Sequence, residues 1–283
     1  MIREPSALSL GNAWRTFAKV RLYRCVSDRL TQVPGAFMRH RQIMRFEFEP
    51  IGICRSAYTD KFGIPRQPRL VTAAEARIEL LPPYDREEAF QALEGFSHVW
   101  LVFIFHADCL EANWSPTVRP PRLGAQTKVG VFASRSPYRP NPIGISAVAQ
   151  HGLERKGQRL MLKVAGADLL DGTPILDIKP YVPYADAIPE AQGGFAQARP
   201  EPRFAVRFSA QAVVTIAEQD PQDRLRLREL IEQVIAQDPR PGYMDRYPDR
   251  REFVLQLYAL EIQWRLEGDC ARVTRITPLT NSG

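Results

Sequence analysis

Apolar and polar positions alternate in short runs through most of the chain, and turn residues separate the runs. A period of two is typical of strands that bury one face. Short strands joined by Gly/Pro turns favour a barrel or a sandwich over alternating βαβ units. The pattern predicts strands over residues 46–53, 76–81, 96–106, 128–133, 145–153 and 159–164.

The rest of the pattern divides the chain. Residues 85–93 predict a short helix, with Asp85 as its N-cap. Residues 187–202 are rich in Ala, Pro, Gln and Gly, which is typical of a linker. A small α+β unit is predicted beyond it, with strands over 204–209, 253–266 and 271–277 and a helix over 223–237. The expected organisation is an extension (1–45), a β domain (46–186), the linker (187–202) and the α+β domain (203–283).

Three loops combine arginine with proline: FGIPRQP at 62–68, RPPRLG at 119–124 and SRSPYRPNPIG at 134–144. Proline holds a loop in one shape, and arginine offers a planar fork of donors to phosphate or carboxylate. The candidates for anion binding are Arg66, Arg122, Arg135 and Arg139.

Residues 166–186 carry the carboxylates Asp168, Asp171 and Asp177. The segment has two interpretations. It can be two turns around a buried strand, with Asp171-Gly172 as a turn signal. Alternatively, its carboxylates can accept hydrogen bonds from the ribose hydroxyls or the amine of an adenosine-type ligand.

Several site classes lack their sequence signals. The chain has neither the G-x-G-x-x-G nor the G-x-x-x-x-G-K-[ST] nucleotide fingerprint. His98 and His106 flank one apolar strand without a third ligand, so hydrogen bonding at the strand ends is favoured over a metal site. The four cysteines are far apart, which favours a reducing compartment without disulfides. No apolar run approaches the length of a membrane helix.

The net charge of +6 is concentrated at the beginning of the chain. Residues 1–45 carry nine basic and two acidic residues, whereas residues 46–283 carry 29 basic and 30 acidic ones. The basic segment has three interpretations: upstream codons that are not normally translated before Met44, an arm that contacts RNA, or a targeting peptide.

Five strings in this order resemble the TsaA/YaeB family, now called TrmO. They are FGIPRQP, LEGFSHVWLVFIFH, VRPPRLG, VGVFASRSPYRPNPIG and LLDGTPILDIKPYVPYAD. The resemblance is dense over residues 46–186 and continues through AQDPRPGY at 236–243. It implies a mainly β fold, with a single-sheeted β-barrel domain and a small C-terminal α+β domain.

The resemblance also implies an activity. The family uses S-adenosylmethionine to methylate the exocyclic nitrogen of threonylcarbamoyl-adenosine, beside the anticodon of tRNA. It works as a cytoplasmic homodimer without a metal, and its cofactor lies near the subunit interface. The alternative is a non-catalytic module on the same barrel that binds RNA or senses S-adenosylmethionine.

Family roles can be carried over onto matching positions. The implied cofactor contacts are Gln67, Pro68, His106, Ala107, Arg135, Ser146, Ala147, Asp168, Leu169, Leu170 and Asp171. Asn141 is our candidate for accepting the N–H of the nitrogen that is methylated. Arg139 or Arg66 is expected to bind the threonyl carboxylate, and RNA contacts are expected at Arg66, Arg122 and Arg139.

Overall fold

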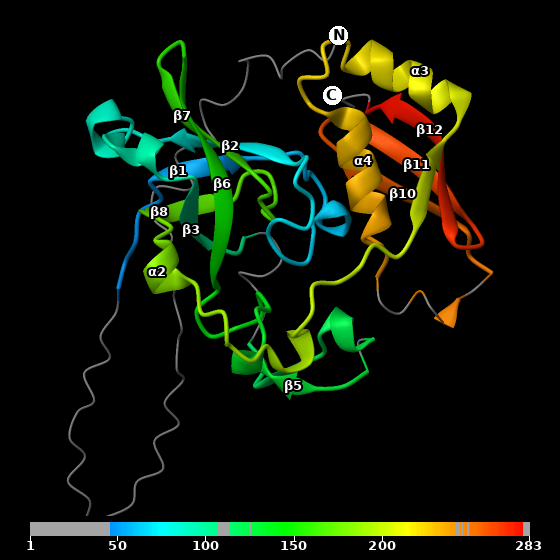
Figure 1. Ribbon diagram of the computed structural model, residues 1–283, viewed down its shortest axis with the longest axis horizontal. Helices are drawn as coiled ribbons and strands as arrows, with labels where there is room; N and C mark the ends of the chain where they lie inside the picture. The colour runs from blue at the N-terminus through cyan, green and yellow to red at the C-terminus, as the bar shows by residue number, and fades with distance from the viewer. Residues whose placement is uncertain are drawn as a thin grey trace, which may run out of the picture.

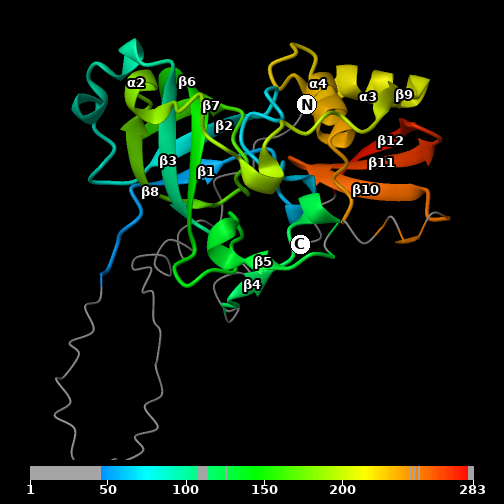
Figure 2. The ribbon, with the colours of Figure 1, turned by 60° about the horizontal axis from the view of Figure 1, so that its bottom comes forward.

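The computed structural model describes residues 46–106, 114–124, 126–241, 244, 246–247 and 249–279. Two β-rich bodies lie side by side (Figure 1). The first contains the strands up to β8, and the second contains α3, α4 and the strands from β9 onward (Figure 2). The prediction of a mainly β fold is confirmed.

Six antiparallel strands pair in a closed ring, in the order β1-β2-β7-β6-β3-β8. The ring closes where β1 pairs with β8, with Gly52 opposite Ile175. Its interior is filled by side chains such as Ile78, Leu101 and Leu162, which are fully buried. The strands are β1 (Gly52–Arg55), β2 (Glu75–Leu80), β3 (His98–Ile104), β6 (Ile143–Lys156), β7 (Arg159–Ala165) and β8 (Pro174–Pro180).

The first predicted strand begins later than expected. Residues 46–53 were expected to pair along their whole length, but β1 starts at Gly52. Phe46 and Phe48 are exposed, so the alternation there does not mark a buried face.

The predicted helix over 85–93 is wrong. Two short 3₁₀ turns replace it, η3 (Glu87–Phe90) and η4 (Leu93–Gly95). Ala92 between them has a φ of 67°, which no α-helix accommodates. Asp85 caps neither turn, because Arg86 precedes η3 and Ala92 precedes η4.

A second, small sheet accompanies the ring. It pairs β4 (Thr117–Val118) with β5 (Val129–Gly130) and lies below the ring in Figure 2. The strand predicted over 128–133 is therefore short, and η6 (Val131–Ala133) follows it directly. The other short elements are η2 (Lys61–Gly63), η5 (Pro121–Leu123), α2 (Pro183–Asp186) and η7 (Gly194–Ala196).

The C-terminal sheet has the order β10-β11-β12-β9, with β9 parallel to β12. Both α3 and α4 cover one of its faces (Figures 1 and 2). The strand predicted over 253–266 is a hairpin, which turns at Tyr258 with a φ of 53°. The elements are β9 (Ala205–Phe208), α3 (Ala210–Gln219), α4 (Leu227–Ala236), β10 (Glu252–Leu257), β11 (Leu260–Glu267) and β12 (Cys270–Pro278).

The two helices of this domain differ in how well the sequence predicts them. The predicted helix over 223–237 is present as α4, and it buries Leu227, Leu230, Ile231, Val234 and Ile235. It starts late, because Arg226 has a φ of 47°. The sequence did not predict α3. Ser209 caps it by accepting a hydrogen bond from the main-chain N–H of Ala212.

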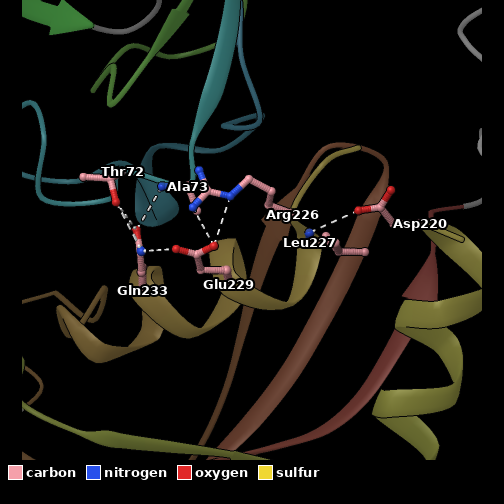
Figure 3. Close-up of polar contacts among 7 residues, drawn as sticks. All are labelled: Thr72, Ala73, Asp220, Arg226, Leu227, Glu229 and Gln233. Atoms are coloured by element: carbon pink, nitrogen blue, oxygen red, sulfur yellow. Dashed lines mark hydrogen bonds and ion pairs between the residues drawn. The ribbon is translucent and has the colours of Figure 1, made fainter. Parts of the chain in front are cut away.

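The second body shares its core with a segment of the first. Tyr58, Val71 and Ala73 pack into the same cluster as α4 and the C-terminal sheet. Polar contacts follow this core (Figure 3). Gln233 Oε1 on α4 accepts from Ala73 N at 3.0 Å, and Gln233 Nε2 donates to Glu229 Oε1 at 2.9 Å. The segment of residues 57–74 therefore belongs to both bodies.

Candidate functional site

A cavity of about 560 Å³ opens between three parts of the chain. The loop before β2 forms one wall, the arginine–proline loop before β6 forms another, and the ends of β3 and β6 with the turn before β8 form the floor. The lining residues are Thr59, Asp60, Lys61, Ile64, Pro65, Arg66, Gln67, Phe103, Phe105, His106, Arg135, Pro137, Tyr138, Arg139, Ile143, Gly144, Ile145, Ser146, Asp168, Leu169, Leu170 and Thr173.

Many of the residues predicted to form the site meet in this cavity. Although they come from distant parts of the sequence, nine of them line it: Arg66, Gln67, His106, Arg135, Arg139, Ser146, Asp168, Leu169 and Leu170. Both interpretations of the segment 166–186 are therefore compatible with the structure, since Asp168 lines the cavity from the turn before β8, and the first two residues of β8 are buried.

Other predicted site residues do not line the cavity. Pro68 is not among the lining residues, and Ala147 is buried on the opposite face of β6 from Ser146, as the strand period requires. Ala107 lies outside the described residues. Asn141 is exposed, and its main-chain carbonyl accepts from Ile143 N at 2.7 Å. Arg122 donates to the main-chain carbonyl of Ala198.

Asp171 does not line the cavity, but it hydrogen-bonds the turn before β8 to the segment after β1. Its Oδ1 accepts from the main-chain N–H of Ser56 at 3.0 Å, and its own N–H donates to the carbonyl of Tyr58 at 2.8 Å. Ser56 Oγ also donates to the carbonyl of Leu169 at 2.7 Å. These bonds hold the segment after β1 against the turn before β8.

Asp168 is the titratable acceptor on the cavity floor. Burial raises its pKa to about 6, although a hydrogen bond from Ser146 and the charge of Arg135 oppose the shift. Ser146 Oγ donates to Asp168 Oδ1 at 2.6 Å. The carboxyl group is thus mostly ionised at neutral pH. Because the carboxylate is poorly solvated, hydrogen bonds from a ligand would stabilise it.

Arg135 joins the two loops at the cavity. Its Nη1 donates to Gln67 Oε1 at 2.9 Å. Nearby, Arg139 Nη1 donates to the carbonyl of Ser134 at 3.3 Å. Both guanidinium groups are therefore held by loop atoms at the edge of a site that also contains a carboxylate.

With this geometry in view, comparison with known proteins identifies the family. The model described as the tRNA-methyltransferase O N-terminal domain matches residues 53–187, and the model of the TrmO C-terminal domain matches residues 201–279. The chain belongs to the TrmO family.

Relatives of known name agree with this family. A tRNA (adenine(37)-N6)-methyltransferase of Escherichia coli (strain K12) is 43% identical over 224 residues, which cover 78% of this chain and 93% of the relative. A protein of Pseudomonas aeruginosa named putative S-adenosylmethionine-dependent methyltransferase RcsF is 50% identical over 221 residues, with the same coverage. The crystal structure of TrmO from Pseudomonas aeruginosa aligns with a TM-score of 0.68 at 42% identity, covering 83% of this chain and 100% of that one.

Some residues that line this TrmO cavity were not predicted as site residues from the sequence. Lys61 directly precedes the FGIPRQP string, and Tyr138 lies within the third loop, so both were close to recognised signals. Phe103 and Phe105 form an edge-to-face pair with ring centroids 5.2 Å apart. Their alternation on a strand gave no sign that they reach a cavity as well as the core.

No described helix has both the length and the apolar character needed to cross a membrane. Within the described ranges, no three His, Cys, Asp or Glu side chains gather as metal ligands would.

Proposed function

We propose that this TrmO family member is an S-adenosylmethionine-dependent tRNA adenine-N6 methyltransferase whose substrate is threonylcarbamoyl-adenosine beside the anticodon. Family membership supports tRNA adenine-N6 methylation. The observation that carries the assignment to this cavity is Asp168, a half-buried carboxyl group that accepts a hydrogen bond from Ser146 and shares one cavity with eight other predicted site residues.

The chemistry of the cavity fits S-adenosylmethionine. Asp168 supplies an acceptor for ribose hydroxyls or an amine, and Phe103, Phe105 and Leu169 supply an apolar surface for adenine. Arg135 supplies a cation for the methionyl carboxylate. The volume of about 560 Å³ leaves room for part of the substrate nucleoside.

When bound, the cofactor supplies an electrophilic methyl group on a sulfonium. The protein then has to align the acceptor nitrogen with that methyl group, and alignment alone lowers barriers by up to about 7–11 kcal/mol. The acceptor nitrogen is urea-like and weakly nucleophilic, so a group that accepts its N–H assists the reaction. We assign this to Asn141, which follows the cavity residue Arg139 by two positions on a proline-rich loop.

Arginine side chains in and near the cavity can bind the anionic groups of the substrate. Arg66 and Arg139 line the cavity, and either can form a fork with the threonyl carboxylate. Arg122 lies outside the cavity, where it can meet an RNA phosphate. We further propose that the six-stranded ring is the β-barrel of the family, and that the protein acts in the cytoplasm as a homodimer.

The alternative function is a non-catalytic module that binds S-adenosylmethionine or RNA. The acceptor and the cations that a methyltransferase needs remain together in one cavity, which favours the enzyme.

Calorimetric titration with S-adenosylmethionine and methyl transfer to tRNA test the proposal together. We expect transfer to tRNA that carries threonylcarbamoyl-adenosine and none to the same tRNA lacking that group. Cofactor binding without transfer to either tRNA would establish the non-catalytic module. Equal transfer to both tRNAs would leave the methyltransferase but refute its substrate.

A further inference from the structure

Thr173, just after the Asp171-Gly172 turn, lies against the cavity residue His106. Thr173 is only 3% exposed. Its Oγ1 lies 3.3 Å from His106 Nδ1 and 2.7 Å from the carbonyl oxygen of Leu170. One buried hydroxyl group therefore lies between a carbonyl and a ring nitrogen.

The proton of this hydroxyl has one favoured position. A carbonyl oxygen can only accept, and a threonine hydroxyl has a single proton to donate. The shorter contact, to Leu170, uses that proton. Thr173 Oγ1 can then only accept from His106, so His106 must carry a proton on Nδ1.

His106 is neutral at physiological pH. Burial lowers its pKa below the ordinary value, and the main chain and carboxylate of Asp171 oppose the shift without reversing it. A neutral imidazole has one proton. If that proton is on Nδ1, Nε2 can only accept a hydrogen bond.

Gly172 leaves space beside this Nε2 atom. Its φ is 84°, and a Cβ built there would lie 3.7 Å from Nε2. His106 itself lines the cavity. A residue with a side chain at position 172 would be strained by this positive φ.

We propose that Thr173 is a positioning residue, which holds His106 in the Nδ1-protonated tautomer so that Nε2 accepts a hydrogen bond from an amine of the cofactor. S-adenosylmethionine has such N–H donors on its adenine and on its amino acid. The hydrogen bond from the cofactor to Nε2 rests on the proposed function, whereas the tautomer of His106 does not. Asp168 and His106 then supply two separate hydrogen-bond acceptors for the cofactor in one cavity.

Nuclear magnetic resonance of protein labelled with ¹⁵N-histidine tests the tautomer directly. The chain has only four histidines, and His106→Phe assigns the signals of interest by their loss. We expect the Nδ1–H pattern in the wild type without cofactor. Thr173→Val should lose this preference, and Thr173→Ser, which keeps the hydroxyl, should restore it.

Cofactor titration of the same variants tests the consequence. A lost hydrogen bond of ordinary strength predicts that Thr173→Val raises the Kd by about two- to tenfold, with Thr173→Ser near the wild type. An Nε2–H tautomer in the wild type, or an unchanged tautomer and Kd in Thr173→Val, would overturn the proposal.

The two failures are distinguishable. The predicted tautomer in a protein that binds no S-adenosylmethionine would refute the proposed function and leave the role of Thr173 toward His106 intact. If Thr173→Val does not fold, the wild-type spectrum and Thr173→Ser still decide the tautomer.

Discussion

Among single residues, Asp168 connects burial most directly with function. Its folded pKa of about 6 lies above the ordinary value of 3.8. The folded state therefore holds a proton that the unfolded state has released between these values. The contribution of this group to stability is greatest below the lower value and falls as the pH rises through the higher one. At neutral pH, burying Asp168 therefore lowers the stability of the fold, and it leaves a carboxylate in the cavity that can accept hydrogen bonds.

We predict that S-adenosylmethionine binding weakens as the pH falls below about 6, because protonated Asp168 accepts hydrogen bonds poorly. Asp168→Asn should bind more weakly at neutral pH and lose this pH dependence. Calorimetry across the acidic range measures both effects. Ser146→Ala is the matched control: it removes the bond that lowers the Asp168 pKa, so the midpoint should move to higher pH. A midpoint that is identical in all three proteins would show that another group titrates.

Among the elements, β6 depends on a glycine at its beginning. A Cβ on Gly144 would lie 2.3 Å from the ring of Phe103, a buried residue that also lines the cavity. Gly144→Ala should therefore displace this ring, lower stability by about 1–3 kcal/mol and weaken cofactor binding. Gly130→Ala is a suitable control, because nothing lies within 4 Å of its Cβ and its φ is −60°. Urea unfolding and calorimetry compare the two, and equal stabilities would contradict the predicted clash.

The loop before β6 carries the proposed substrate contacts. Arg139→Lys should slow methylation, because a point charge cannot reproduce the bidentate fork, and loss of such a contact costs about 1.5–3 kcal/mol. Asn141→Ala should lower the rate of the chemical step and leave cofactor affinity nearly unchanged, because its proposed partner is the substrate. Single-turnover methylation of modified tRNA measures both. Wild-type rates in both variants would make the loop a structural clamp alone.

At the scale of the whole molecule, charge is divided unevenly along the chain. All of the net positive charge is in residues 1–45, which lie outside the described residues. If this segment contacts phosphates, deleting residues 1–43 should weaken nonspecific RNA binding and flatten its salt dependence. Filter binding at several salt concentrations measures the slope. An unchanged slope would favour the interpretation that the upstream codons are not normally translated.

Five of the six ring strands were predictable from their apolar residues, but the pattern did not decide between a barrel and a sandwich, and β8 lies in the segment 166–186, for which two interpretations stayed open. Other elements could not be predicted, because their local sequence does not indicate the structure that they adopt. The sequence of α3, AQAVVTIAEQ, is rich in β-branched residues and gives a weak helical signal. The hairpin of β10 and β11 alternates continuously through its turn. At the site, the arginine–proline loops marked two walls of the cavity, but Phe103 and Lys61 became recognisable only once the fold brought these walls together.

The core shared by the two bodies has a consequence for synthesis on the ribosome. Thr59 donates to the carbonyl of Tyr258, 199 positions further along the chain, and Tyr58 and Val71 are buried in the cluster that contains α4 and β11. At usual translation rates, roughly ten to forty seconds separate the emergence of these segments. During that interval the wall of the cavity that follows β1 has no partner for its apolar side chains. The nascent protein thus completes its site only after the last strands emerge, and until then it exposes a surface that chaperones recognise.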